Sequence, residues 1–175
     1  LFGALGIYAG KININGIENL DTSEVTDMSY MFTNGSQYTD LDLSSFNTSN
    51  VTKMSGMFYG CSKLTNVNLA NFNTKNVVKL TNLFNGCSAI ENINLNSFET
   101  SNVTNMYGMF ENCENLNCNL SNWDVRNVKD MNYMFYKCKK FNCKLSKWDV
   151  SKVKDMNYTF DDCTSLKNKP SWYEE

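Results

Sequence analysis

The chain has 175 residues, of which 42% are hydrophobic and 13% aromatic, enough apolar material for one domain with a continuous core. It contains no histidine, which excludes a Ser-His-Asp triad, a His-ligated metal and a His proton shuttle within the chain. The formal charge of −2 argues against a nucleic-acid partner, because no basic excess is present to neutralise phosphates. No apolar run approaches the roughly 18 residues of a membrane span, so we expect no direct membrane insertion.

The sequence begins with an apolar segment, residues 1–10, which lacks the basic flank and the cleavage site of a signal peptide. We expect it to pack within an N-terminal cap over residues 1–24. Six copies of a repeat follow, first 26 and then 25 residues apart, and each begins with a valine: Val25, Val51, Val77, Val103, Val128 and Val153. The sequence therefore predicts a single domain, with repeats over residues 25–163 and a C-terminal cap over residues 164–175.

Each copy begins with a pattern typical of a short helix. Val51, Met54 and Phe58 are spaced i, i+3 and i+7, which places them on one helical face, and the other copies keep this spacing. Two helical turns are too short to be stable alone, so neighbouring copies must cover one another. The helix is predicted to end two residues after the phenylalanine, at a glycine or asparagine in the first four copies: Asn34, Gly60, Gly86 and Asn112.

The second half of each copy predicts a short parallel strand. Val67 and Leu69 alternate with polar residues, which indicates one buried and one exposed face. The equivalent pairs are Leu41/Leu43, Ile93/Leu95, Cys118/Leu120 and Cys143/Leu145. A strand and a helix in every copy predict an α/β fold: a right-handed solenoid of about six coils, with short strands on one face and short helices on the other.

The repeats also resemble a known family. The pattern L-x-x-V-x-L-x-x-F at residues 64–72 resembles a leucine-rich repeat in which an aromatic residue takes the usual Asn position. The pattern F-x-x-C-x-x-L at residues 58–64 is similar to the BspA-like subclass, and LANFNTKNV at residues 69–77 resembles the surface-protein repeats of that subclass. The resemblance implies a BspA-like leucine-rich-repeat protein, extracellular and exposed on a bacterial cell, which acts in adhesion or host interaction and is not an enzyme.

Cysteine occupies two columns of the repeat. One column contains Cys61, Cys87, Cys113, Cys138 and Cys163, and the aliphatic strand column contains Cys118 and Cys143. Since aliphatic residues fill the second column in the other copies, we expect these thiols to be small buried hydrophobes. Disulfides between neighbouring coils remain open, because coils about 4.8 Å apart lie within reach of a disulfide. A zinc site is disfavoured, since the chain has no CxxC pair.

Two polar columns predict structural roles. Asn50, Asn76, Asn102 and Asn127 can form a ladder that supplies hydrogen bonds to backbone groups at the corner of each coil. The other column contains threonine in four copies and then valine, which indicates a partly buried site: Thr22, Thr48, Thr74, Thr100, Val125 and Val150.

The exposed side of the predicted strands carries a two-column stripe of polar residues. After Asp40 and Asp42 in the first copy, the stripe consists of Asn66, Asn68, Asn92, Asn94, Asn117, Asn119, Asn142 and Lys144. Amide side chains suit peptide backbone or sugar hydroxyls, so the stripe is the candidate ligand face. The alternative is that a solenoid in water simply needs polar residues there.

Two functions follow from these features. The first is a non-enzymatic interaction or adhesion module that binds a protein or glycan of a host or neighbouring cell through the repeat face. The second is a structural spacer or antigenic stalk with no ligand of its own. We expect no cofactor, metal or catalytic group, because no metal cluster or nucleophile-base pair is readable in the sequence.

Overall fold

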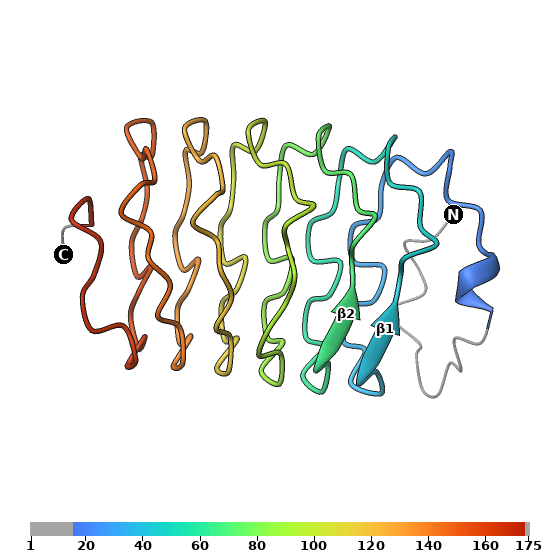
Figure 1. The fold of residues 1–175 in the computed structure, drawn as a ribbon, viewed down its shortest axis with the longest axis horizontal. Helices are drawn as coiled ribbons and strands as arrows, with labels where there is room; N and C mark the ends of the chain where they lie inside the picture. The colour runs from blue at the N-terminus through green and yellow to red at the C-terminus, as the bar shows by residue number, and fades with distance from the viewer. Residues whose placement is uncertain (1–15, 174–175) are drawn as a thin grey trace.

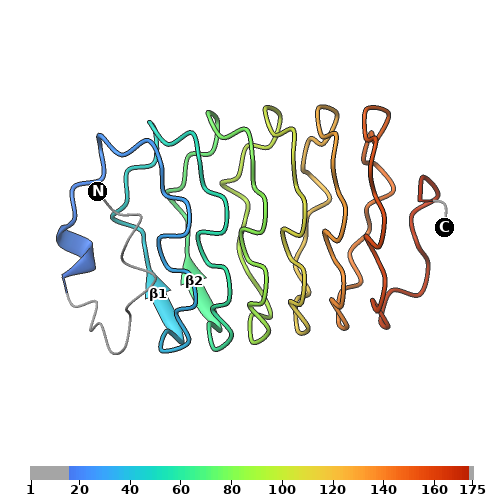
Figure 2. The same ribbon diagram turned by 180° about the vertical axis from the view of Figure 1, so that it is seen from behind.

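The computed structural model describes residues 16–173 as a row of coils stacked along one axis (Figure 1; seen from behind in Figure 2). Regular elements are few: the 3-10 helix η1 (Ile17–Asn19) and the strands β1 (Asp40–Asp42) and β2 (Asn66–Asn68). β1 and β2 pair in parallel, with Leu41 opposite Val67. The apolar segment at residues 1–10, and with it most of the expected N-terminal cap, lies outside the described residues.

The predicted α/β leucine-rich-repeat solenoid is wrong. The described residues contain no α-helix, and strands form in the first two copies only, so Ile93, Cys118 and Cys143 do not lie in strands. Turns and segments without regular secondary structure make up most of each coil.

A left-handed residue interrupts each predicted helix. It stands five positions after the valine and has a φ between 54° and 61°: Tyr30, Gly56, Asn82, Gly108, Tyr133 and Tyr158. A second left-handed residue follows four positions later, where the helix was expected to end: Asn34, Gly60, Gly86, Asn112, Lys137 and Asp162. A residue with positive φ cannot continue a right-handed helix, so the chain turns twice within each segment instead.

Backbone hydrogen bonds run between coils where the helix was predicted. The Tyr30 N–H donates to the Ser55 carbonyl at 3.0 Å, and the Phe32 N–H donates to the Met57 carbonyl at 2.8 Å. Amides between them close turns within the coil, as in the 3.3 Å bond from the Met31 N–H to the carbonyl of residue 28. Each coil is therefore held by its neighbours, through parallel contacts that recur at five junctions.

Stacked aromatic rings fill the core. The Phe84 ring lies 5.1 Å from the Phe58 ring and 5.7 Å from the Phe110 ring, with interplanar angles of 4° and 3°. The column continues through every repeat, and its members are Phe32, Phe58, Phe84, Phe110, Phe135 and Phe160. The expectation that Phe58, Phe84 and Phe110 form a continuous buried stack is confirmed.

The thiols lie inside the coils. The Cys113 Sγ donates to the Phe84 carbonyl at 3.0 Å, and the other four cysteines of its column make the same contact. Burial raises the pKa of Cys118 and of Cys163 to about 12. The expectation of buried thiols is confirmed at every cysteine except Cys143, which is half-buried.

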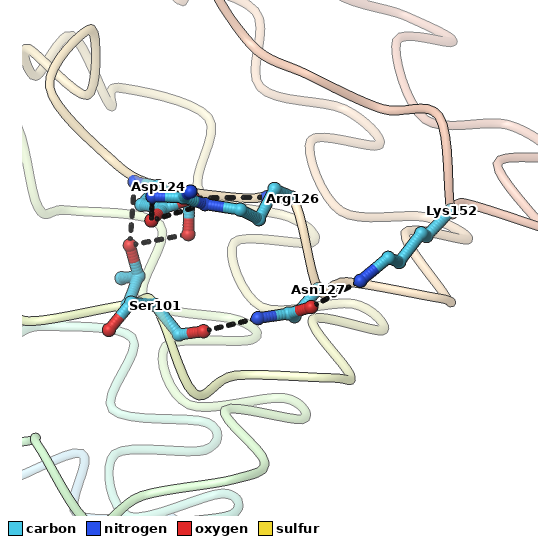
Figure 3. A network of polar contacts seen from close by, with 6 residues as sticks. Ser101, Asp124, Arg126, Asn127 and Lys152 are labelled. Carbon is cyan, nitrogen blue, oxygen red and sulfur yellow. Dashed lines mark hydrogen bonds and ion pairs between the residues drawn. The ribbon is translucent and has the colours of Figure 1, made fainter.

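The asparagine column bonds backbone groups at the corners of the coils, as expected, and the threonine column does the same. The Asn127 Nδ2 donates to the Ser101 carbonyl at 2.9 Å and its Oδ1 accepts from Lys152 (Figure 3). The buried Thr100 hydroxyl donates to the Asp124 carbonyl and accepts from the Asp124 N–H, both at 3.0 Å. At the first four junctions these side chains thus satisfy backbone groups that would otherwise lie without partners at the corner.

Candidate binding surface

The structure places the predicted stripe on the surface. All eight of its residues are exposed except Asn68, which is half-buried. The parallel pairing of β1 with β2 sets Asp40 beside Asn66 and Asp42 beside Asn68. At the other end of the stripe, Asn142 and Lys144 line a cavity of about 450 Å³. The stripe is therefore a continuous polar strip along one side of the stack.

One of its two columns is used by the fold. The Oδ1 of Asn94 accepts from the backbone N–H two residues later at 3.1 Å, and Asn119 does the same at 3.0 Å. Asn68 accepts from the Ala70 N–H at 3.2 Å and donates to Asp42 at 3.0 Å. Such side-chain to backbone bonds fix the turn that follows the strand segment. The backbone N–H of residue 44 also holds the pKa of Asp42 below its usual value.

The other column consists of Asn66, Asn92, Asn117 and Asn142. These four side chains are exposed and make no hydrogen bond to any described residue. Each amide keeps a carbonyl acceptor and two N–H donors for an external group. The sequence pattern did not separate the two columns, because both contain asparagine at the same spacing.

A second candidate site lies at the C-terminal end of the stack. A cavity of about 840 Å³ opens there between the turns of the sixth coil and the residues that follow them. Its lining includes Met156, Tyr158, Asp161, Asp162 and Lys169. Tyr158 is 51% exposed, and its ring stacks on the ring of Tyr133 at 5.0 Å. Sequence reasoning missed this site, because Met156 and Tyr158 stand at repeat positions that are more covered inside the stack.

No group of three or more acidic, cysteine or histidine side chains in residues 16–173 is placed to hold a metal ion. Within the same residues, no helix has the length and hydropathy needed to cross a bilayer.

The sequence matches a family described as Mycoplasma protein of unknown function, DUF285, over residues 6–92 and 60–173. These matches cover more than half of the chain, so the chain belongs to this family. No curated protein and no solved structure matches it.

Proposed function

We propose that the chain is a non-enzymatic interaction module of a bacterial cell surface, which binds a protein or glycan of a host or neighbouring cell. The observation that carries the proposal is the column of Asn66, Asn92, Asn117 and Asn142, whose exposed amides have no hydrogen-bond partner among the described residues. The other asparagine columns are used to hold coils or turns together. The resemblance of the repeats to BspA-like surface proteins supports a location on the cell surface.

The spacing of the free column suits an extended ligand. Neighbouring coils lie about 4.8 Å apart, so the four amides present donors and acceptors at a regular interval. A peptide backbone or a chain of sugar hydroxyls offers complementary groups at short, repeated intervals. The ligand would contact several coils at once, and its affinity would come from many weak polar contacts.

Arrays of extracellular-matrix proteins and of glycans test the proposal. Changing Asn66, Asn92 and Asn117 together to Ala should weaken binding at least tenfold and leave the melting temperature unchanged, because these exposed amides make no hydrogen bond to any described residue. The matched control changes Asn68, Asn94 and Asn119 to Ala, which should lower the melting temperature by removing turn contacts.

Full binding by the first triple variant would contradict the proposal. Binding to no member of either array by the unaltered protein would favour the structural spacer instead.

A further inference from the structure

The exposed amide column reaches a group of lysines in the fifth coil. Lys140 and Lys144 stand two residues before and two residues after Asn142, the member of the column in this coil. All three residues are exposed, whereas Phe141 and Leu145 between and beside them are buried. Because exposed and buried residues alternate here, the two lysines lie on the same side of the coil as the amide.

The sixth coil continues this surface in the same register. The Ser165 N–H donates to the Lys139 carbonyl at 2.9 Å, and the Trp172 Nε1–H donates to the Leu145 carbonyl at 2.9 Å. Equivalent bonds join the fifth coil to the fourth, both at 3.1 Å. The segment of the sixth coil between these two bonds is therefore held beside the segment of the fifth coil that carries the lysines.

These two segments form the walls of the cavity of about 450 Å³. Lys144 lines it from the fifth coil, and Lys167 and Lys169 line it from the sixth. Among the described residues, no acidic side chain lines this cavity. The rest of its polar lining consists of amide and hydroxyl side chains: Asn142, Ser146, Asn168 and Ser171. The cavity therefore combines positive charge with neutral hydrogen-bonding groups.

The positive charge of this surface is not neutralised within the described fold. The side chains of Lys140, Lys144 and Lys167 are exposed and make no ion pair or hydrogen bond to any described residue. Lys139, in contrast, pairs with Glu114 at 2.9 Å. Like charges on one small surface repel one another, so an anion that binds among these lysines is attracted to all of them.

The first coil carries the opposite charge on the same stripe. Asp40 and Asp42 occupy the repeat positions that hold Asn142 and Lys144 in the fifth coil, and both are exposed. The coils between them contain only asparagine at these positions. An anionic group is therefore repelled from the first coil and attracted to the fifth and sixth, which sets where it binds along the stripe.

We propose that the lysines of the fifth and sixth coils bind the sulfate or carboxylate groups of an anionic glycan. This inference rests on the proposed function and names the ligand class of the same surface. An anionic glycan carries both hydroxyls and charged groups along one chain, which matches a surface where amides lead into lysines. The ammonium group of lysine is a compact charge on a flexible stem, so it can meet anionic groups without a fixed geometry.

Calorimetric titration of the full chain with defined octasaccharides tests the proposal, at about 0.15 M salt so that weak surface attraction is screened. A heparin octasaccharide offers sulfates and carboxylates, and a hyaluronan octasaccharide offers carboxylates alone. At least one of them should bind, and a neutral dextran oligosaccharide of the same length should bind at least tenfold more weakly. Binding of neither anionic octasaccharide, or equal binding of the dextran, would overturn the proposal.

A variant with three lysines changed tests the site itself. Changing Lys140, Lys144 and Lys167 together to Gln should weaken binding of the anionic octasaccharide at least tenfold. The melting temperature should stay unchanged, because these exposed side chains have no partner among the described residues. The matched control makes the same change in net charge at three other exposed lysines without side-chain partners among the described residues: Lys75, Lys79 and Lys129. Equal losses in the two variants would show a general effect of net charge and overturn the proposal.

A single-stranded DNA oligonucleotide of equal charge tests whether the surface binds any polyanion. If the DNA binds as tightly as the octasaccharide, the surface does not recognise a glycan and the proposal fails.

The asparagine variant separates this inference from the proposed function. If changing Asn66, Asn92 and Asn117 weakens glycan binding and the lysine variant binds fully, the proposed function stands and this inference fails. If the lysine variant loses the octasaccharide and the asparagine variant binds it fully, the lysine site stands and the amide column does not carry the binding.

Discussion

The left-handed residue five positions after each valine allows a test that distinguishes the observed turns from the helix that the sequence pattern suggests. Tyr133 has a φ of 58°, and its ring contacts the rings of Tyr107 and Tyr158. Tyr133→Gly and Tyr133→Ala both remove the ring, so the difference between them reports the backbone alone. A left-handed conformation costs an alanine about 1–2 kcal/mol, while glycine loses about 0.4–1 kcal/mol more chain entropy on folding. The glycine variant should therefore be more stable by about 0.5–1 kcal/mol.

Urea denaturation followed by circular dichroism measures this difference, and the two variants should share one m-value. In a helix the order reverses, because glycine is about 1 kcal/mol less favourable than alanine in a helix interior. Lys154 is the control position, since it is exposed and its φ is not left-handed. Lys154→Ala should be more stable than Lys154→Gly. An alanine variant at position 133 that is more stable than the glycine variant would refute the turn geometry.

Four further predictions concern the core, the thiols and the threonine column. Phe84→Ala should lower the free energy of unfolding by about 3–5 kcal/mol in denaturant melts, because its ring is fully buried between two others. Phe160→Ala should lower it less, because Phe160 has one stacking neighbour in the column. Burial raises the pKa of Cys118 to about 12, above the unfolded value of about 8.5. The unfolded chain therefore loses this proton at lower pH than the folded chain, so the free energy of unfolding should be constant below about pH 8 and should fall between about pH 9 and 12, as melts at a series of pH values would show. In the native protein, iodoacetamide should react first at Cys143, as mass spectrometry would show. Thr74→Val should cost about 1–2 kcal/mol by thermal denaturation, because the buried hydroxyl both donates to and accepts from the backbone of residue 99.

The repeat and its columns could be predicted from sequence because they depend on burial alone. A residue type that recurs at one repeat position meets the same environment in each coil, so Phe84 must lie beside Phe58 and Phe110 once the coils stack. The same argument placed the thiols of the Cys113 column inside the core and the Asn127 column at the corners. None of these conclusions required the backbone path within a coil.

The backbone path could not be predicted from the same pattern. Apolar residues at i, i+3 and i+7 face one side in a helix, but two successive turns with a left-handed residue between them bury the same positions. Whether the segment forms a helix or two turns depends on which carbonyls accept hydrogen bonds from its N–H groups. In this chain the Tyr30 N–H bonds to the next coil instead of to a carbonyl four residues earlier. Gly56 and Gly108, in the middle of two predicted helices, were the sequence signal against a helix.

The two candidate sites could be predicted to different degrees, because the sequence pattern indicates which residues are exposed but not which contacts they make. Exposure of the asparagine stripe follows from the alternation of apolar and polar residues in the sequence. The division into a free column and a turn-forming column depends on whether each amide accepts a hydrogen bond from the backbone N–H two residues later. The C-terminal cavity is harder to predict, because Met156 and Tyr158 occupy repeat positions that are more covered inside the stack. A repeat sequence specifies what each coil offers to the next. How far each side chain is covered depends on the neighbouring coil, so Tyr133 is half-buried whereas Tyr158, at the same repeat position, is 51% exposed.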